Sequence, residues 1–388
     1  MTDKPSTETY IRLVLWYVTA VASISAVPYL SVVLSDAGVG AGSIATILLL
    51  MPIGRIFGAP FWGWIADRTA AHQLVFRAAT LLGAVSGLGF IFAETPALLA
   101  GSVLLMALSR APVFPIADAT TVSILGEDRR NYGKIRAAGS IAFLVAIGSG
   151  GILRSTWPRA PLILGGILLV VTAAISWGFP QIETPPRRPT LKQLGKVLVH
   201  PILLPLMGIF VLHGMTITAY DSLFSLHVET LGFEPWVTGT AISLGVGVEV
   251  VVLMSGRRLL DRFGPIPLLL FAVAVGIPRW LITGSTGDPY LLMATQALHG
   301  FHFGAFWIAG VALFSEQAPK NLAASAQALL PASTFGVGYF SSMALASVLL
   351  GPLTLQQFFG AMAGVSALAT ILTGILYFRT PSASYSSV

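Results

Sequence analysis

Residues 63–68 read Gly-Trp-Ile-Ala-Asp-Arg and close an apolar run that begins at residue 41. The Asp-Arg pair returns in residues 261–264, Asp-Arg-Phe-Gly, just after a second apolar run at 236–255. The two pairs lie 194 residues apart, which is half of the 388-residue chain. This spacing indicates that the chain consists of two similar halves.

The composition shows that most of the chain lies in lipid. Apolar residues make up 55% of the chain and charged residues only 10%, whereas a soluble domain carries about 25% charged residues. Runs of about 20 apolar residues are long enough to cross a bilayer as helices, and they do not alternate as the strands of a membrane barrel would. We predict an all-α membrane protein with twelve spans, at roughly 11–34, 41–64, 73–93, 96–118, 135–153, 161–179, 202–228, 236–255, 265–284, 289–314, 323–349 and 354–378.

The repeat divides these spans into two sets of six. We expect an N-terminal half at 1–180, a cytoplasmic linker at 181–200 and a C-terminal half at 201–388, with one further long loop at 120–134. Two six-helix halves related by a parallel repeat describe the major facilitator architecture, in which the substrate binds between the halves near the middle of the bilayer.

The basic residues predict the orientation. The net charge is +6, and sixteen of the 22 Lys and Arg residues fall on the side of both termini. The other side has Arg154 and Arg159, and four Arg lie within spans. Because cytoplasmic loops carry an excess of Lys and Arg, we expect both termini in the cytoplasm of a bacterial cell and the spans in its inner membrane. The basic balance therefore does not indicate nucleic acid as a partner.

Several classes of site are excluded by motif. The chain has no Cys and only six His, which argues against a disulfide framework, a metal site or thiol catalysis. It lacks HExxH, GxSxG and phosphate-loop motifs, so neither an enzyme nor an ATP-driven pump is expected. We expect no cofactor, and a monomer.

Charged side chains within the spans are the first candidates for function. A charge at the bilayer centre costs at least about 2.5–3.5 kcal/mol, so these groups should face a cavity or one another. Four Arg against three carboxylates favour an anionic substrate, since Arg holds a carboxylate with two parallel hydrogen bonds. Internal salt bridges that lock helices are the alternative. The set is Arg55, Arg110, Asp118, Arg136, Asp221, Glu249 and Arg279.

An aromatic stripe adds a possible stacking surface. His299, Phe303, Phe306 and Trp307 recur at helical spacings of three and four residues. They lie at a depth similar to that of Arg279, so a planar substrate is favoured there. Helix packing or a lipid-facing belt is the alternative interpretation.

The stretch 132–140, Tyr-Gly-Lys-Ile-Arg-Ala-Ala-Gly-Ser, resembles the start of helix 5 in the lactose permease and phenylpropionate permease branch of the major facilitator superfamily. Asp118 falls where that branch has an acid paired to Arg136. Phe143 falls on the aromatic residue that stacks against the sugar in lactose permease. The resemblance implies that these three residues bind substrate.

The second half carries the resemblance further. Glu249 and Arg279 match substrate-binding residues of helices 8 and 9, and His299 lies in a matching helix-10 stretch. His302 stands where lactose permease has its proton-carrying Glu. The resemblance, with this departure, implies Asp221, Glu249 or His302 as the proton acceptor. With the other buried charges and the stripe, the predicted substrate-binding set is Arg55, Arg110, Asp118, Arg136, Phe143, Glu249, Arg279, His299, Phe303 and Trp307.

The two Asp-Arg loops resemble the Gly-x-x-x-Asp-Arg loop of the superfamily. They comprise Gly63, Asp67 and Arg68 in the first half and Asp261 and Arg262 in the second. The resemblance implies a gate that holds helices together on the cytoplasmic side in one conformation. A charged turn without a gating role is the alternative.

These observations lead to one main hypothesis. The chain is expected to be a proton-coupled symporter for a small organic anion, including aromatic acids, that works by alternating access. The substrate carboxylate would bind Arg136 or Arg279, and a buried acid would carry the proton. A proton-coupled sugar or nucleoside symporter is the alternative, as is a siderophore importer or an exporter of the same fold.

Overall fold

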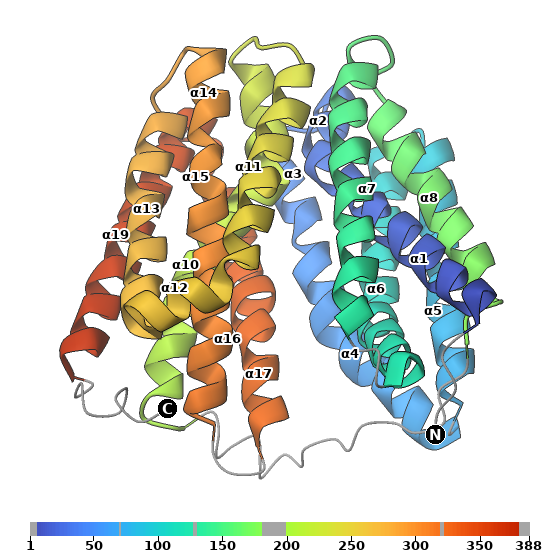
Figure 1. The fold of residues 1–388 in the computed structure, drawn as a ribbon. Coiled ribbons are helices and arrows are strands. Elements are labelled where there is room, and N and C mark those ends of the chain that lie inside the picture. Colours follow the sequence, from blue (N-terminus) through green and yellow to red (C-terminus); the bar gives the residue numbers. More distant parts are fainter. Residues whose placement is uncertain (1–5, 70, 127–129, 181–198, 319–321, 380–388) are drawn as a thin grey trace. The chain divides into compact units, whose positions relative to one another are not determined.

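The computed structural model describes residues 6–69, 71–126, 130–180, 199–318 and 322–379, and the regular secondary structure in these ranges is helical throughout (Figure 1). Within them, eleven helices are long and apolar enough to cross a membrane. The predicted span at 161–179 is a shorter apolar helix of 17 residues. The predicted count of twelve is therefore reached only when this shorter helix is included.

The chain forms two compact units. The first consists of Met1–Pro186 together with Glu234–Gly239, and the second of Arg187–Phe233 together with Thr240–Val388.

The helices of the first unit follow the predicted spans closely. The predicted loop at 120–134 is wrong, because helix continues to Leu125 and resumes at Arg130. The elements are α1 (Thr7–Ala22), the 3₁₀ helix η1 (Ser23–Tyr29), α2 (Leu30–Asp36), α3 (Ala41–Leu48), α4 (Leu50–Thr69), α5 (His72–Phe92), α6 (Pro96–Leu125), α7 (Arg130–Arg154) and α8 (Ala160–Ser176).

The second unit has more interrupted helices. Two of its spans contain π-helical segments, a form that is often found at functional sites. Its elements are α10 (Leu203–Thr230), α11 (Trp236–Met254), α12 (Gly256–Phe263), α13 (Pro265–Thr283), α14 (Pro289–Thr295), α15 (Ala297–His299), the π segment η3 (Gly300–Ala305), α16 (Phe306–Glu316), α17 (Ala323–Pro331), the π segment η4 (Ala332–Gly338), α18 (Tyr339–Leu349) and α19 (Leu355–Arg379).

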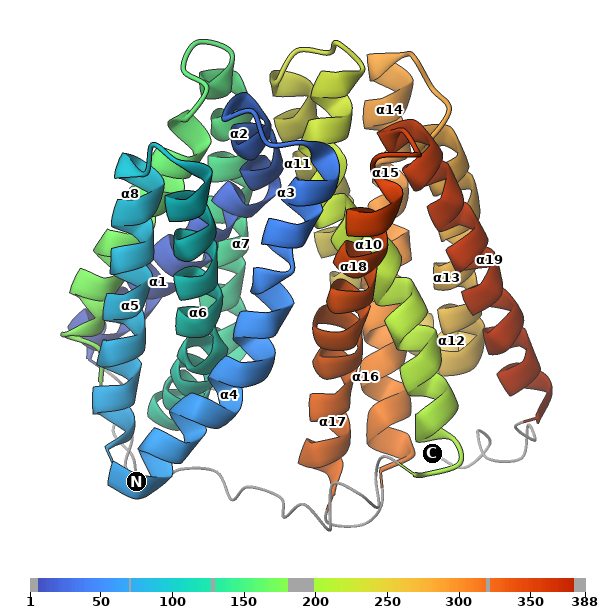
Figure 2. The same ribbon diagram turned by 180° about the vertical axis from the view of Figure 1, so that it is seen from behind.

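Small residues bring the helices of the first unit into close contact. A Cβ added to Gly54 of α4 would lie 2.5 Å from the Cβ of Ala107 on α6, and one added to Gly58 would lie 3.0 Å from that of Ala111. The two helices run side by side in Figure 2. Small residues four apart allow such backbone approach between membrane helices, and here they place two Arg-bearing helices together.

Glycine residues also allow close helix packing in the second unit. A Cβ on Gly300 would lie 2.5 Å from the backbone nitrogen of Glu249, and one on Gly214 would lie 2.4 Å from the carbonyl oxygen of Thr334. These contacts hold η3 against α11 and η4 against α10. Both π segments are thereby fixed in the interior of the unit.

Candidate functional site

The predicted pair of Asp118 and Arg136 is present in the first unit. Arg136 Nη1 donates to Asp118 Oδ1 at 3.4 Å, while Tyr17 Oη donates to the same oxygen at 2.5 Å. The side chains of Arg136 and Asp118 are 42% and 35% exposed. The Arg136 guanidinium carbon also lies 5.6 Å from the ring centre of Tyr17 and 5.7 Å from that of Phe114. Asp118 is thus held mainly by Tyr17, and Arg136 is bound to it loosely.

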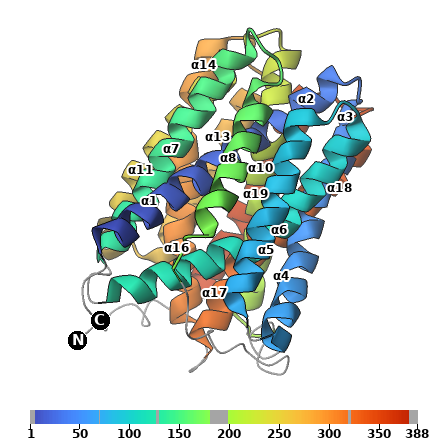
Figure 3. The same cartoon turned by 90° about the vertical axis from the view of Figure 1, so that its right-hand side faces the viewer.

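A glycine of the 132–140 stretch explains why these residues meet. A Cβ added to Gly139 of α7 would lie 2.9 Å from the backbone oxygen of Tyr17 on α1. Figure 3 shows α1 lying against α7 and α8. Because Gly139 lets α7 approach α1, Arg136 comes within reach of Tyr17 and of Asp118 on α6.

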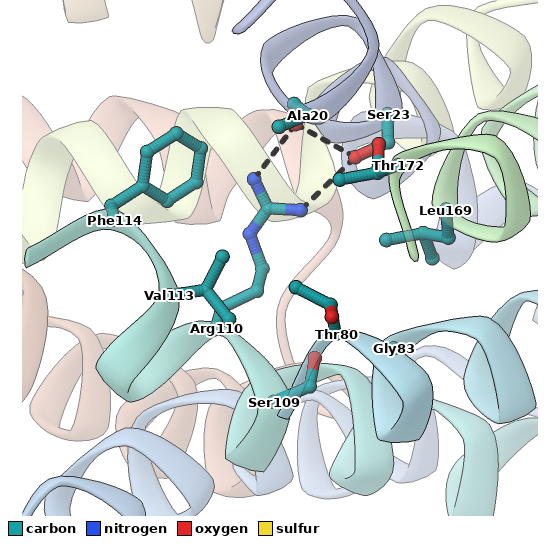
Figure 4. A pocket seen from close by; sticks show the side chains of 10 residues that line it. All are labelled: Ala20, Ser23, Thr80, Gly83, Ser109, Arg110, Val113, Phe114, Leu169 and Thr172. Carbon is teal, nitrogen blue, oxygen red and sulfur yellow. Dashed lines mark hydrogen bonds between the residues drawn. The ribbon is translucent and has the colours of Figure 1, made fainter. Parts of the chain in front are cut away.

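Arg110 holds the end of α1. Its Nη2 donates to the backbone oxygen of Ala20 at 3.2 Å, and its Nη1 donates to Ser23 Oγ at 3.2 Å (Figure 4). Ala20 lies in the last turn of α1, and its backbone oxygen also accepts a hydrogen bond from Ser23 Oγ. The structure thus places Arg110 against the backbone of α1.

A small cavity adjoins this guanidinium (Figure 4). Its volume is about 20 Å³, and one water molecule needs about 10–15 Å³, so an organic substrate does not fit. Ser23, Ser109 and Thr172 line it. Ser23 and Ser109 donate to carbonyl oxygens of their own spans, while Thr172 Oγ1 lies within hydrogen-bond distance of the Leu168 carbonyl oxygen and of Thr19 Oγ1. The polar groups around the cavity thus already have hydrogen-bond partners within the first unit.

Arg55 and Phe143 lie on helices α4 and α7 of the same unit. Arg55 is half-buried on α4, and its charge acts on that of Arg110. Phe143 is half-buried on α7, seven residues beyond Arg136 and hence on the same face of that helix. Phe143 therefore extends the Arg136 face along α7.

Arg279 is the most deeply buried charge of the second unit. It lies on α13 with no exposed surface, and its Nη2 donates to Gln296 Oε1 at 2.9 Å. Its guanidinium carbon lies 4.4 Å from the ring centre of Tyr220 and 4.1 Å from that of Trp280. Its Nη1 makes no hydrogen bond within the described residues. Asp221 on α10 interacts electrostatically with the Arg279 guanidinium.

Glu249 and His299 form a second pair in this unit. His299 Nε2 lies 3.4 Å from Glu249 Oε2, and the two side chains are 7% and 16% exposed, respectively. The ring of His299 stacks on Phe303 at 5.8 Å, and Phe303 stacks on Trp307 at 5.8 Å. The predicted stripe is therefore a column of stacked rings that ends on a carboxylate.

One member of the predicted stripe points elsewhere. Phe306 is fully buried and stacks on His213 of α10 at 3.7 Å. His302, in η3, also faces α10, because its Nε2 lies 3.3 Å from Thr216 Oγ1. Its Nδ1 lies 2.9 Å from the backbone oxygen of Ala272. His302 and Phe306 thus belong to the interior of the unit and not to the stacked column.

The gating residues make local contacts. Arg68 lies 5.5 Å from the ring centre of Trp64, and Arg262 lies 5.3 Å from that of Phe263. Asp261 pairs with Arg257 one turn away at 3.7 Å. Gly63 is buried in α4, and the Asp67 side chain lies outside the described residues. The gating role stays a prediction.

Three side chains of these clusters were not predicted from the sequence as site residues. Tyr17 binds Asp118 across 101 positions, Gln296 is the acceptor for Arg279, and His213 stacks on Phe306 beside His302. No local motif marks them, since each acts through a partner on another helix. Among the described residues, no group of three His, Cys, Asp or Glu could hold a metal ion.

Comparison with known proteins agrees with this architecture. A maltose permease of Geobacillus stearothermophilus is 27% identical over 80% of this chain and 80% of its own length. A probable 3-phenylpropionic acid transporter of Escherichia coli (strain K12) is 25% identical over 70% of this chain and 73% of its own. The crystal structure of the D323A mutant of nucleoside transporter NupG matches with a TM-score of 0.84 at 15% identity, covering 95% of this chain and 99% of that one.

A family model settles the assignment. The model described as the MFS_1 like family matches residues 10–359, which is most of the chain. The relatives are permeases and transporters, and the fold of the solved structures is the same. The chain therefore belongs to the MFS_1 like family and is a multi-pass membrane transporter of the major facilitator superfamily.

Proposed function

We propose that this transporter is a proton-coupled symporter for a small organic anion in a bacterial cell membrane. Substrate and proton would move together by alternating access, which a ligand drives by binding one conformation better than the other. The N-terminal and C-terminal halves would act as the two moving parts, with both termini in the cytoplasm. The Asp-Arg loops would gate the cytoplasmic side.

The main support for an anionic substrate is that Arg136 is only weakly paired and partly exposed. Among the described residues its ion pair is with Asp118, which is long at 3.4 Å, and 42% of its side chain is exposed. Asp118 gives its closer contact, 2.5 Å, to Tyr17. Because a guanidinium has five donors in a planar fork, Arg136 can bind a substrate carboxylate while Asp118 stays on Tyr17.

The aromatic column supports a ring in the substrate. Phe303 and Trp307 are half-buried, and each also lies about 6 Å from Phe335, at 6.2 and 6.0 Å between ring centres. Stacked aromatic faces contribute roughly 0.5–1.5 kcal/mol per pair beyond the area they bury. A planar acid would therefore gain affinity on this column.

The coupled proton has candidates in the second unit. Glu249 is largely buried and has His299 as its partner at 3.4 Å, so this pair can exchange a proton with little movement. Asp221 and His302 are the other candidates. A proton that neutralises buried charge lowers the cost of carrying that charge through the membrane.

A neutral sugar or nucleoside is the second candidate substrate. Asp118 and Glu249 supply carboxylates that accept hydrogen bonds from hydroxyl groups, and stacked rings suit sugar faces and bases alike. The relatives include a maltose permease, and the similar structures include a nucleoside transporter.

Uptake by proteoliposomes tests the proposal. Labelled aromatic acids, aliphatic acids, sugars and nucleosides would be offered with an inward proton gradient. We expect accumulation of an organic acid, and its loss in Arg136→Gln. Arg77→Gln is the matched control, because Arg77 on α5 bonds the backbone oxygen of Trp177. Accumulation of a sugar or nucleoside in place of every acid would establish the second candidate instead.

A further inference from the structure

A pair of buried imidazoles lies inside the second unit, apart from the stacked column. His213 on α10 is 1% exposed and His302 in η3 is fully buried, with 4.3 Å between their ring centres. Neither ring nitrogen of His213 makes a hydrogen bond within the described part of the chain. A buried polar group without a partner is rare and needs an explanation.

Thr216 contacts the His302 ring and the backbone of His213. Its hydroxyl lies 2.8 Å from the backbone oxygen of His213 and 3.3 Å from Nε2 of His302. A hydroxyl has one hydrogen and can also accept. It therefore has two arrangements, in which it donates either to the carbonyl or to the imidazole nitrogen.

The other nitrogen of His302 fixes the proton arrangement. Nδ1 lies 2.9 Å from the carbonyl oxygen of Ala272, which can only accept, so Nδ1 carries a hydrogen. In neutral His302, Nε2 accepts from Thr216. In the imidazolium, Nε2 donates to Thr216, whose hydrogen then turns to the His213 carbonyl. Both ring nitrogens of His302 therefore have a hydrogen-bond partner in either state.

The surroundings of the pair are polar and rigid. A Cβ on Gly276 would lie 2.5 Å from both His302 Cε1 and Ser366 Oγ, so these two side chains converge on that glycine. The hydroxyls of Ser366 and Thr334 are buried and make no hydrogen bond among the described residues. Polar groups held in place at low dielectric interact strongly with a charge that appears beside them.

The charged groups around the two histidines determine whether anion binding favours or opposes their protonation. Arg279 on α13 acts on both imidazoles and opposes a positive charge there. An anion that offsets Arg279 would favour protonation, and by reciprocity the proton would favour the anion. The charged and titratable groups that act on the pair are Arg279 on α13 and His299 on α15. Arg279 in turn interacts with Tyr220 and Asp221 on α10, and His299 has Glu249 on α11 as its partner.

We propose that His213, Thr216 and His302 form a proton-binding site inside the second unit, with the proton on His302 Nε2 and the Thr216 hydroxyl as its switch. The His213 ring provides a second base beside it. The role of this site in symport rests on the proton coupling proposed above. The site would bind the coupled proton when an organic anion occupies the transporter.

A comparison of two threonines tests the switch. Thr216→Val removes the hydroxyl that accepts the Nε2 hydrogen. Thr218→Val is the matched control, because Thr218 is also buried on α10 and donates to the carbonyl of Gly214, one turn back. His213→Phe keeps a ring against Phe306 but removes both nitrogens, and Thr216→Ser restores the hydroxyl.

The readouts are the pH dependence of proton-driven uptake and of substrate exchange. Loss of a hydrogen bond to a charged group shifts a titration midpoint by about one pH unit or more. We expect the midpoint of uptake in Thr216→Val to move about one unit toward lower pH, because the protonated state loses more. His213→Phe should move the midpoint in the same direction but by less, since the His213 ring nitrogens make no hydrogen bond among the described residues. Exchange at equal pH should persist. Thr218→Val and Thr216→Ser should follow the unmodified protein.

Failure of the proton-binding site can be distinguished from failure of the proposed function. An unchanged pH profile in both Thr216→Val and His213→Phe overturns the site, as does an equal shift in Thr218→Val. If the unmodified protein transports no organic anion, the proposed function fails but the site is still testable. The ¹⁵N resonances of labelled histidine in the purified protein should then show a buried imidazolium on acidification that Thr216→Val suppresses, and its absence would contradict the proposal.

Discussion

Tyr17→Phe should weaken binding of the substrate anion, although Tyr17 is not proposed to contact that anion directly. In the structure, the Tyr17 hydroxyl donates to Asp118 Oδ1 at 2.5 Å, and Arg136 reaches the same oxygen at 3.4 Å. A hydrogen bond to a charged group contributes about 1.5–3 kcal/mol. Without it, Asp118 turns fully to Arg136, and a substrate carboxylate must compete with it.

The magnitude follows from that competition. A difference of about 1.4 kcal/mol is tenfold in affinity, so Kd for the anion should rise about tenfold or more. Asp118→Asn should act in the opposite direction, because it removes the competing carboxylate and leaves Arg136 with its full charge. Kd should then fall several-fold. Titration calorimetry or ligand-induced thermal stabilisation of the purified protein measures both.

Tyr29→Phe is the control for this prediction. The Tyr29 hydroxyl donates to the backbone oxygen of Ile147 at 2.9 Å within the same unit. Its loss should reduce stability by about 1 kcal/mol and leave the anion Kd unchanged. If Tyr17→Phe and Asp118→Asn both left Kd unchanged, Arg136 would not be the anion anchor.

Three further changes follow from the packing and the second unit. Gly139→Ala should destabilise the first unit by about 1–3 kcal/mol, because its Cβ would lie 2.9 Å from the Tyr17 backbone oxygen, whereas Gly133→Ala, with nothing within 4 Å, should not; thermal unfolding measures both. Gln296→Leu should cost about 1.5–3 kcal/mol, since it removes the neutral side chain that accepts hydrogen bonds from buried Arg279, and a loss below about 0.5 kcal/mol in denaturant unfolding would refute this. Trp307→Ala should raise KM for aromatic acids more than for aliphatic acids, by about 0.5–1.5 kcal/mol of lost stacking, and equal effects on both would contradict a stacking role.

Much of the fold was predictable because the lipid environment restricts the options. Apolar runs of the required length predict helices directly, and the repeated Asp-Arg pair predicts two halves. The predicted loop at 120–134 is wrong because α6 continues to Leu125. The charged and polar residues at the end of α6 do not interrupt the backbone hydrogen bonds that define it.

The candidate site was predictable where a motif covered it. Arg136 and Asp118 meet as expected, whereas the contact between Glu249 and His299 was not predicted from the sequence. Arg110, like Arg136, lies within a predicted span, but its hydrogen bonds go to the Ala20 backbone oxygen at the end of α1 and to Ser23 Oγ. The roles of Tyr17 and Thr216 depend on contacts between distant segments, which helical spacing does not encode.

Direct recording of proton movement tests the central claim most sharply. Proteoliposomes without any imposed gradient would receive an organic acid that the transporter accumulates, with the external pH followed by an electrode. We predict that the external medium becomes more alkaline as the anion enters, and that Arg136→Gln abolishes the signal. Entry of the anion with no change in external pH would contradict proton symport.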